Sequence, residues 1–249
     1  MKGIILAGGL GTRLRPLTLV TNKHLLPVYD RPMIYYPIQC LVNAGIDDVL
    51  IVTGDQAGDF IKLLRNGRDL GLSHLEYAYQ EGEGGIADAL KLGRKFSEDD
   101  KVCVILGDNI IERDIRAPAA RFAEQPSGAR LLLKEVPDPA RFGVVRLDGD
   151  PPDGRLVEIV EKPEDPPSPY AVIGIYFYDS DVFDICDTLK PSRRQELEIT
   201  DVNNAYLERG DLAYDVLEGW WNDAGTFESL HRVSRLVAEG GANQVAAPS

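Results

Sequence analysis

The first half of the chain alternates short apolar runs, rich in β-branched residues, with stretches of helical spacing, and this alternation constrains the fold most. Each apolar run is nearly continuous, as a strand buried on both faces of a sheet requires. The pattern predicts the α/β class: a doubly wound, mixed but mainly parallel sheet flanked by helices. The predicted strands cover residues 3–6, 49–53, 75–79 and 102–106. The predicted helices cover residues 37–44, 59–64 and 86–95.

The second half contains further strand candidates separated by turns of Pro, Gly and Asp. These candidates cover residues 130–135, 143–147, 157–161 and 172–178. We expect them to extend the same sheet and to build a lid-like half. One domain should therefore cover residues 1–239, divided near residue 110, with a flexible tail over residues 240–249.

The net charge limits the possible partners. Lys and Arg number 27 against 40 Asp and Glu, which gives a formal charge of -13. Because a surface that coats nucleic acid must be basic, the composition disfavours nucleic-acid binding. A small anionic ligand remains possible if a few cations are concentrated at one site.

The sequence also lacks the signals of a membrane or secreted protein. No apolar stretch of about 18 residues is present, and the first six residues do not form a secretory signal. Cys40, Cys103 and Cys186 are widely spaced among apolar residues, which predicts reduced thiols in the core. We therefore expect a cytoplasmic protein.

A glycine-rich loop directly follows the first predicted strand. Gly8, Gly9 and Gly11 would let the backbone approach a phosphate, while Thr12, Arg13 and Arg15 supply side-chain donors. Such a loop can also be rich in glycine for steric reasons alone. It matches neither the P-loop nor the dinucleotide fingerprint, because the spacing differs and nearby prolines keep the segment irregular. The loop thus favours an anion site of another kind over a Rossmann oxidoreductase.

Several motifs occur in a fixed order along the chain. They are LAGGLGTRLRPLT from Leu6, NKHLLPV from Asn22, RPMIYYPI from Arg31, LGDN from Leu106, FGVV from Phe142, EKP from Glu161, ELEITDVN from Glu196 and WNDAGT from Trp221. This series resembles the sugar-1-phosphate nucleotidylyltransferases through to about residue 236. The likeness is greatest to members that join dTTP to glucose 1-phosphate.

The resemblance implies a Rossmann-like nucleotidyltransferase fold, with a nucleotide-binding half over residues 1–110 and a sugar-binding half over residues 111–239. It implies the formation of dTDP-glucose and pyrophosphate, the first step of dTDP-deoxysugar synthesis such as that of dTDP-rhamnose. It also implies a homodimer or homotetramer. Longer members carry further C-terminal helices at a regulatory site, so we expect that site to be reduced or absent here.

The chemistry of this reaction suits the charged residues of the motifs. A sugar phosphate is already an anionic nucleophile, so the protein must position two anions and neutralise their charge. By resemblance, Arg13 stabilises the triphosphate and leaving pyrophosphate, Lys23 the α-phosphate, and Lys162 and Arg194 the sugar phosphate. Outside this motif context, each cation would more often be an ordinary solvated surface charge.

Two carboxylates are expected to bind Mg²⁺. The resemblance assigns Asp108 and Asp223 as the ligands, and hard oxygen donors suit this ion. The alternatives are that Asp108 caps the following segment and that Asp223 belongs to a turn. Asn222 and Ala224 differ from the Leu and Thr usual in the family, which leaves the surroundings of Asp223 open.

The resemblance also assigns residues to the two substrates. In the nucleotide site, the amide of Gln80 can donate to and accept from a pyrimidine edge. Asp108 and Arg13, already assigned to Mg²⁺ and to the triphosphate, also belong to this site. The expected nucleotide-binding residues are Leu6, Gly8, Gly9, Gly11, Thr12, Arg13, Gln80, Gly85 and Asp108. The expected residues of the sugar-phosphate site are Gly143, Glu161, Lys162, Val172 and Arg194. Glu161 would accept hydrogen bonds from sugar hydroxyls.

Two alternatives stay open at this point. The first is an enzyme with the same mechanism that uses UTP or another hexose phosphate, because a pocket separates nucleotides differing by a methyl only modestly, by about 1–3 kcal/mol. The second is a non-catalytic regulatory subunit that binds a nucleotide sugar. The presence of all the expected cations and carboxylates argues against this second alternative.

Overall fold

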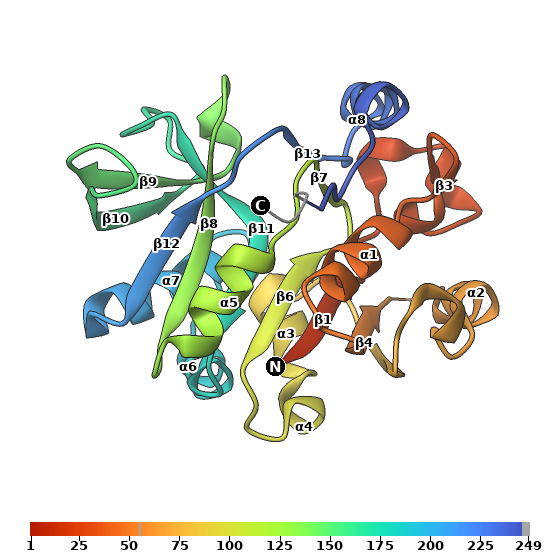
Figure 1. Cartoon of the computed structure of the whole chain (residues 1–249), viewed down its shortest axis with the longest axis horizontal. Helices are drawn as coiled ribbons and strands as arrows, with labels where there is room; N and C mark the ends of the chain where they lie inside the picture. The colour runs from red at the N-terminus through yellow and green to blue at the C-terminus, as the bar shows by residue number, and fades with distance from the viewer. Residues whose placement is uncertain (55, 246–249) are drawn as a thin grey trace.

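A nine-stranded sheet forms the centre of the computed structural model, which describes residues 1–54 and 56–245 (Figure 1). Its main path has the order β10-β9-β11-β6-β1-β4-β5. Strands β1 (Lys2–Ala7), β4 (Asp48–Thr53), β5 (His74–Tyr79) and β6 (Val102–Leu106) pair in parallel. Antiparallel pairs join four strands of the second half, which are β8 (Ala129–Glu135), β9 (Gly143–Asp148), β10 (Arg155–Glu161) and β11 (Tyr170–Tyr178). Strand β12 (Leu212–Val216) joins β8 in parallel. The predicted class and all eight predicted strands are confirmed.

Strand β1 shows why the sheet is covered on both faces. Ile4 and Ile5 are both fully buried, yet they belong to separate hydrophobic clusters. Successive side chains of a strand point to opposite faces, so two adjacent isoleucines require a core on each side. A continuous apolar run thus encodes a central strand.

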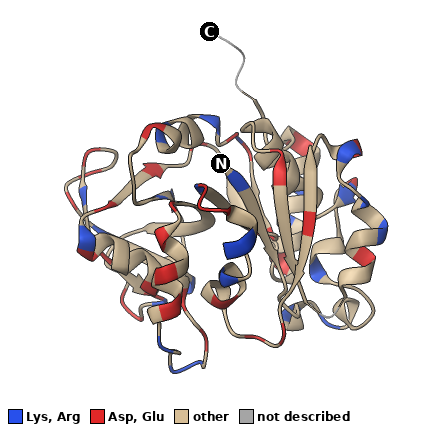
Figure 2. Cartoon of the chain, turned by 90° about the horizontal axis from the view of Figure 1, so that it is seen from below, with Lys and Arg blue, Asp and Glu red and all other residues tan. Residues whose placement is uncertain are grey.

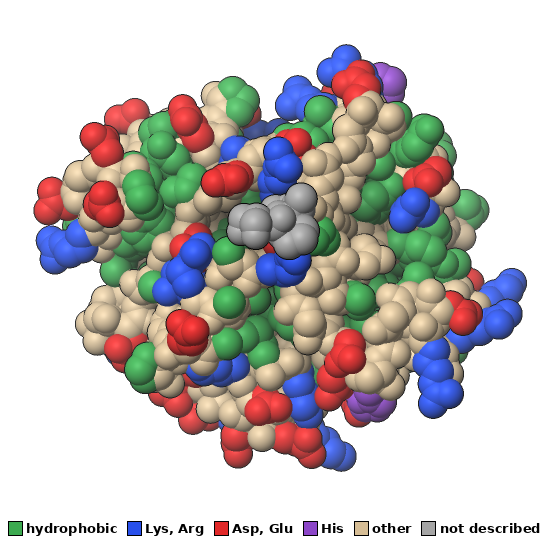
Figure 3. Space-filling model, in the orientation of Figure 1, with side chains coloured by type: hydrophobic (Ala, Val, Ile, Leu, Met, Phe, Trp, Pro, Cys, Tyr) green, Lys and Arg blue, Asp and Glu red, His purple; other side chains and the backbone are tan. Residues whose placement is uncertain are grey.

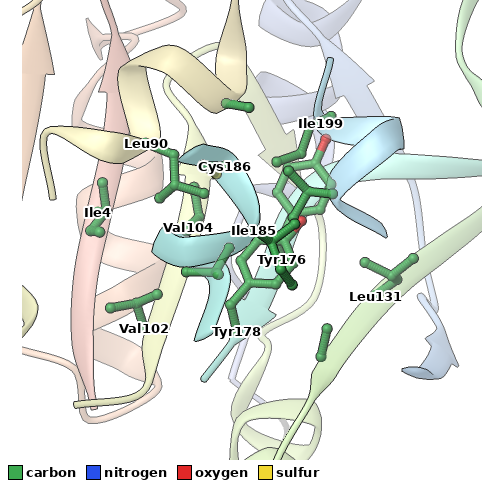
Figure 4. Packing of buried hydrophobic residues seen from close by; sticks show 14 of the residues in the cluster. Ile4, Leu90, Val102, Val104, Leu131, Tyr176, Tyr178, Ile185, Cys186 and Ile199 are labelled. Atoms are coloured by element: carbon green, nitrogen blue, oxygen red, sulfur yellow. The ribbon is translucent and has the colours of Figure 1, made fainter. Parts of the chain in front are cut away.

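Helices cover the two faces in separate groups. On the face of Ile5 lie α1 (Tyr35–Asn43), α2 (Ala57–Leu64) and α5 (Arg116–Glu124). On the face of Ile4 lie α3 (Ile86–Lys91), α4 (Arg94–Ser97), α6 (Asp181–Thr188) and α7 (Ile199–Arg209). Figure 4 shows this second core, where Leu90 of α3 and Ile185 of α6 pack beside Val104 and Tyr176 of the sheet.

One predicted helix is divided. The spacing of residues 86–95 predicts a single helix, but α3 ends at Lys91 and α4 begins at Arg94. The amides of Leu92 and Gly93 bond three residues back, which tightens the chain into a turn. A Cβ on Gly93 would lie 2.5 Å from Cδ1 of Ile4, so the turn brings the backbone against the sheet. Helices α5, α6 and α7 were not predicted.

Short elements complete the edge of the sheet near the glycine loop. The loop segment forms 3₁₀ turns at Thr12–Leu14, Leu17–Leu19 and Lys23–Leu25, followed by β2 (Pro27–Val28) and β3 (Arg31–Pro32). A separate two-stranded pair joins β7 (Asn109–Ile111) to β13 (Trp221–Asp223). Helix α8 (Phe227–Gly240) packs on β2 and β13. Two more 3₁₀ turns lie at Arg68–Leu70 and Pro139–Arg141.

The residues after α8 differ from the flexible tail expected for residues 240–249. The Asn243 amide nitrogen Nδ2 donates to the carbonyl of Tyr36, and its backbone N–H donates to Ile111. Asn243 is buried, so these bonds satisfy polar groups that water does not reach. Residues 241–245 are therefore attached to the domain, whereas residues 246–249 lie outside the described part of the chain.

The cysteines are buried in the core, as expected, and none of them is in a disulfide. Burial raises the pKa of the Cys186 thiol to about 12, which keeps it protonated. Among the described residues no helix is long and apolar enough to cross a membrane.

Charged residues are distributed over the whole molecule. Figure 2 shows Asp and Glu along with Lys and Arg on helices and loops of both halves. On the face shown in Figure 3, the two signs are interspersed without a broad basic area. This face therefore offers no basic patch for an anionic ligand.

Candidate active site

A cavity of about 570 Å³ lies where the parallel strands β1 and β6 end. The carboxyl ends of parallel strands are the usual ligand position in open α/β sheets. Both halves of the chain contribute to its wall. Of the predicted residues, the cavity is lined by Leu6, Gly8, Gly9, Arg13, Lys23, Gln80, Gly85, Asp108, Gly143, Glu161, Lys162, Val172 and Asp223.

Three predicted residues stay outside the cavity wall. Gly11 has a φ of 61°, and a Cβ there would lie 2.9 Å from Cβ of Lys23. Gly11 therefore turns the loop and makes room for Lys23. Thr12 is exposed at the start of the first 3₁₀ turn. Arg194 lies beside the cavity, paired with Glu198 at 2.7 Å.

Lys23 and Asp108 form an ion pair in the cavity, with 2.6 Å between Nζ and Oδ2. Asn22 sets the position of Lys23, because its side chain accepts a hydrogen bond from the N–H of His24 and starts a 3₁₀ turn. Burial raises the pKa of the Asp108 carboxyl, but the charge of Lys23 and hydrogen bonds outweigh burial and hold that pKa below its ordinary value. Asp108 is therefore a carboxylate at neutral pH.

The buried Asn109 side chain holds the other oxygen of Asp108. Trp221 Nε1 donates to Asn109 Oδ1 at 2.7 Å, and the Gly174 amide donates to the same oxygen at 3.0 Å. These two donors fix the amide, so its Nδ2 faces Asp108 Oδ1 at 3.0 Å. Asp108 is thus oriented by strands from both halves.

Asp223 is brought beside Asp108 by the pairing of β13 with β7, in which Asp223 lies opposite Asn109. The Ala224 amide also donates to the backbone carbonyl of Asp108 at 2.8 Å. Burial and the negative charge of Asp108 raise the pKa of Asp223. Arg141 partly offsets this, with Nη2 3.8 Å from Asp223 Oδ2.

These two carboxylates fit a magnesium ion. Two neighbouring negative charges that repel one another are stabilised by a dication, and carboxylate oxygens are ligands that Mg²⁺ prefers. Within the described ranges no three His, Cys, Asp or Glu side chains gather as a metal site. A magnesium ion here would take few protein ligands and complete its shell with water and substrate oxygens, as it usually does in phosphate sites.

Arg13 approaches the carboxylates from the glycine loop. A Cβ on Gly225 would lie 2.9 Å from Arg13 Nη2 and 3.7 Å from Asp108 Oδ2. The guanidinium and the carboxylate thus converge on the backbone of Gly225, where a side chain would displace Arg13. The charges of Arg13 and Arg141 both act on Asp223.

Glu161, the last residue of β10, and the following Lys162 line the same cavity. Thr200 Oγ1 donates to Glu161 Oε2 at 2.6 Å, while Arg194 Nη2 lies 3.2 Å from Oε1. Lys162 Nζ is 3.5 Å from the same oxygen. A Cβ on Gly143 would lie 3.1 Å from Thr200 Oγ1, so glycine leaves space beside the carboxylate.

Gln80 occupies the end of β5, as expected, and is buried. Its Nε2 donates to the carbonyl of Gly85 at 3.3 Å and to Asp88 Oδ2 at 3.1 Å. A Cβ on Gly8 would lie 2.8 Å from Gln80 Oε1, so Gly8 makes room for this oxygen. We expected the amide both to donate and to accept, but its two hydrogens are already used within the protein.

Several lining residues escaped the sequence analysis. Arg141, Thr200 and Asn109 lie within or next to quoted motifs, yet no role follows from their position in the chain. His24 also lines the cavity and is buried, with Nδ1 2.7 Å from Asn22 Oδ1. Only contacts between distant segments reveal these residues.

The fold and the site together define a class of α/β proteins in which cations of a glycine-rich loop segment face a pair of carboxylates at the ends of parallel strands. Comparison with known proteins makes this class specific. The family model described as nucleotidyl transferase matches residues 2–240. The chain belongs to this nucleotidyl transferase family.

Among its relatives are proteins named glucose-1-phosphate thymidylyltransferase. Those of Neisseria meningitidis and Mycolicibacterium smegmatis are each 46% identical, over 95% of this chain and 82% of the relative. A Bacillus anthracis structure assigned to the same activity, solved with a sucrose, is 51% identical with a TM-score of 0.89 and covers 95% of this chain and 94% of its own. A UDP-glucose pyrophosphorylase complexed with UDP-glucose is 26% identical, with a TM-score of 0.86, over 96% and 98%.

Proposed function

We propose that this chain is a glucose-1-phosphate thymidylyltransferase, which converts dTTP and α-D-glucose 1-phosphate into dTDP-glucose and pyrophosphate. The main support is the identity of about 45% to proteins of that name over nearly the whole chain. The site agrees with this function, because a single cavity is lined by Gln80, by Glu161 and by the cations Arg13, Lys23 and Lys162.

In the proposed reaction, a phosphate oxygen of glucose 1-phosphate forms a bond to the α-phosphorus of dTTP. The bond between that phosphorus and the bridging oxygen breaks, and pyrophosphate leaves in line with the attack. No protein nucleophile is needed, so the residues act by position and charge. Lys162 and Arg194 hold the sugar phosphate, Lys23 faces the α-phosphate, and Arg13 takes the growing charge of the pyrophosphate.

Asp108 and Asp223 would hold Mg²⁺. The bound ion would supply positive charge to the phosphate oxygens between the two substrates. Asn109 orients the Asp108 carboxylate for this role, and Lys23 neutralises that carboxylate in the protein itself.

A homo-oligomeric assembly and a cytoplasmic location are further parts of this proposal. The buried, unpaired cysteines suit a reducing compartment. Light scattering after size-exclusion chromatography measures the assembly, for which we expect a dimer or tetramer.

Pyrophosphate release tests the function. The purified chain is incubated with Mg²⁺ in a panel that crosses dTTP, UTP, dCTP and dATP with glucose, galactose and mannose 1-phosphates. We expect the highest kcat/KM with dTTP and glucose 1-phosphate. Preference for UTP would support the UTP-using alternative, and no release with any pair would contradict the enzymatic function.

A further inference from the structure

Asp88 does not line the cavity, but it contacts Gln80, which does. It lies in the first turn of α3, and its side chain is one-third exposed. Its Oδ2 accepts a hydrogen bond from Gln80 Nε2 at 3.1 Å. The carbonyl of Gly85 accepts the second bond from the same nitrogen at 3.3 Å. Asp88 therefore contacts Gln80 from behind the cavity wall.

These two contacts determine which end of the Gln80 amide is available. A carboxylate and a carbonyl can only accept, so they require the NH₂ group and use both of its hydrogens. If the amide turned over, its oxygen would face two acceptors in a place that is only 8% exposed at Gln80. The amide oxygen therefore stays on the side of Gly8, where a glycine leaves it room.

The position of Asp88 is itself defined by its neighbours. A Cβ on Gly84 would lie 2.5 Å from Asp88 Oδ2, so the preceding loop passes close to this oxygen. The other oxygen, Oδ1, lies 4.0 Å from Lys91 Nζ. Lys91 also lies 3.9 Å from Asp187 of α6. One carboxylate oxygen thus faces Gln80 and the other faces the exterior.

We propose that Asp88 is a positioning residue that sets the polarity of the nucleobase site, by holding the Gln80 amide with its oxygen toward the base. The inference rests on the proposed function, in which a pyrimidine nucleotide enters beside Gln80. An amide oxygen held toward the base matches a base that presents an N–H, as thymine and uracil do at N3. Cytosine presents an acceptor at N3, so the fixed amide oxygen repels it.

Binding of dTTP, dUTP and dCTP, measured by titration calorimetry in the presence of Mg²⁺, tests this role in the full chain. The variants are Asp88→Asn, which keeps the shape, and Asp88→Ala, which removes the acceptor. In both, we expect the ratio of the dCTP Kd to the dTTP Kd to fall about tenfold, because position 88 no longer requires the NH₂ group and only the Gly85 carbonyl opposes an amide that turns over. The ratio of dUTP to dTTP should stay unchanged, since both bases carry the same imide.

Asp187→Asn is the matched control. It removes the same charge from the other carboxylate beside Lys91, and it leaves Gln80 untouched. Its dCTP to dTTP ratio should equal that of the unchanged protein. Thermal unfolding verifies that each variant is folded, and either Asp88 variant alone is sufficient for the comparison.

The proposal is overturned if a folded Asp88 variant keeps the original dCTP to dTTP ratio, or if Asp187→Asn changes it equally. A general loss of affinity for all three nucleotides would also contradict it, because that result indicates a purely structural role. The proposed function fails separately, when the nucleotides bind but no pyrophosphate is released with any sugar phosphate. Absence of binding by the unchanged protein would overturn both.

Discussion

The Lys23 ammonium lies 2.6 Å from the Asp108 carboxylate, which joins the glycine-loop segment to the end of β6. One partner is expected to contact phosphate and the other to bind Mg²⁺. Because each neutralises the other, the protein can keep both charges in a largely buried place before substrates arrive. The same ion pair therefore contains the group expected to contact the α-phosphate and a group expected to bind Mg²⁺.

Replacing Arg13 by Ala should lower kcat about 10²- to 10³-fold, because the charge that develops on the leaving pyrophosphate loses its donor. Initial rates of pyrophosphate release at saturating substrates measure this. Arg15→Ala is the control, since Arg15 is exposed in the same segment and does not line the cavity. Equal rates for the two variants would show that Arg13 has no special role.

Asp108→Asn should raise the Mg²⁺ concentration needed for half-maximal activity, about tenfold or more, because the ligand loses its charge. A magnesium titration of the initial rate measures this change. Asp165→Asn, at an exposed position, serves as the control for loss of one negative charge. An unaltered titration midpoint in Asp108→Asn would rule out Asp108 as a ligand.

Lys162→Met should raise the KM for glucose 1-phosphate about tenfold and leave the KM for dTTP nearly unchanged. Lys162 lines the cavity beside Glu161, the residue expected to bind the sugar, so its charge should act on one substrate. Steady-state kinetics with each substrate varied in turn separates the two constants. Lys190→Met, at an exposed site outside the cavity, should alter neither, and a change confined to dTTP would contradict the assignment.

The free energy of unfolding should decrease in acid because of His24. Burial lowers the pKa of this imidazole from 6.5 to about 3, and the nearby charge of Lys23 acts in the same direction. The unfolded chain therefore binds a proton at His24 near pH 6.5, whereas the folded chain does not. The contribution of the neutral, buried His24 to the free energy of unfolding is therefore complete above pH 6.5. It is lost progressively as the pH falls toward 3, and the loss is roughly 2 kcal/mol between pH 7 and pH 5.

Urea unfolding at several pH values checks this expectation. His24→Asn removes the imidazole, so its unfolding free energy should decline less steeply from pH 7 to pH 5. His231→Asn, on the exposed side of α8, is the control and should retain the full slope. Parallel pH profiles for the unchanged protein and His24→Asn would refute the buried neutral state of His24.

Most strands of the central sheet could be predicted, because a strand that is buried on both faces requires apolar residues at successive positions. The run around Ile4 and Ile5 is apolar at every position, so neither the register nor the partner strand needs to be known. The division of the helix at Gly93 could not be predicted in this way. It depends on contact with Ile4, nearly ninety positions away in the chain.

The candidate site shows the same division. The ordered motifs contain ten of the thirteen predicted residues that line the cavity, since a glycine loop or a strand-end Asp carries its chemistry in local sequence. The resemblance supplied the other three, which are Gln80, Gly85 and Val172. The proximity of Arg141 to Asp223, and the restraint of Asn109 by Trp221, arise from strand pairing between distant segments. No local pattern contains that information.

The sequence by itself determined the α/β class, the positions of eight strands along the chain and the resemblance to a family, because these depend on residue types at fixed spacing. Tertiary structure alone decided the state of each functional group. It paired Lys23 with Asp108, placed Asp223 beside them and turned the Gln80 amide toward Asp88. Charge and hydrogen-bond direction depend on distances of a few ångströms, and only the folded chain brings distant residues that close.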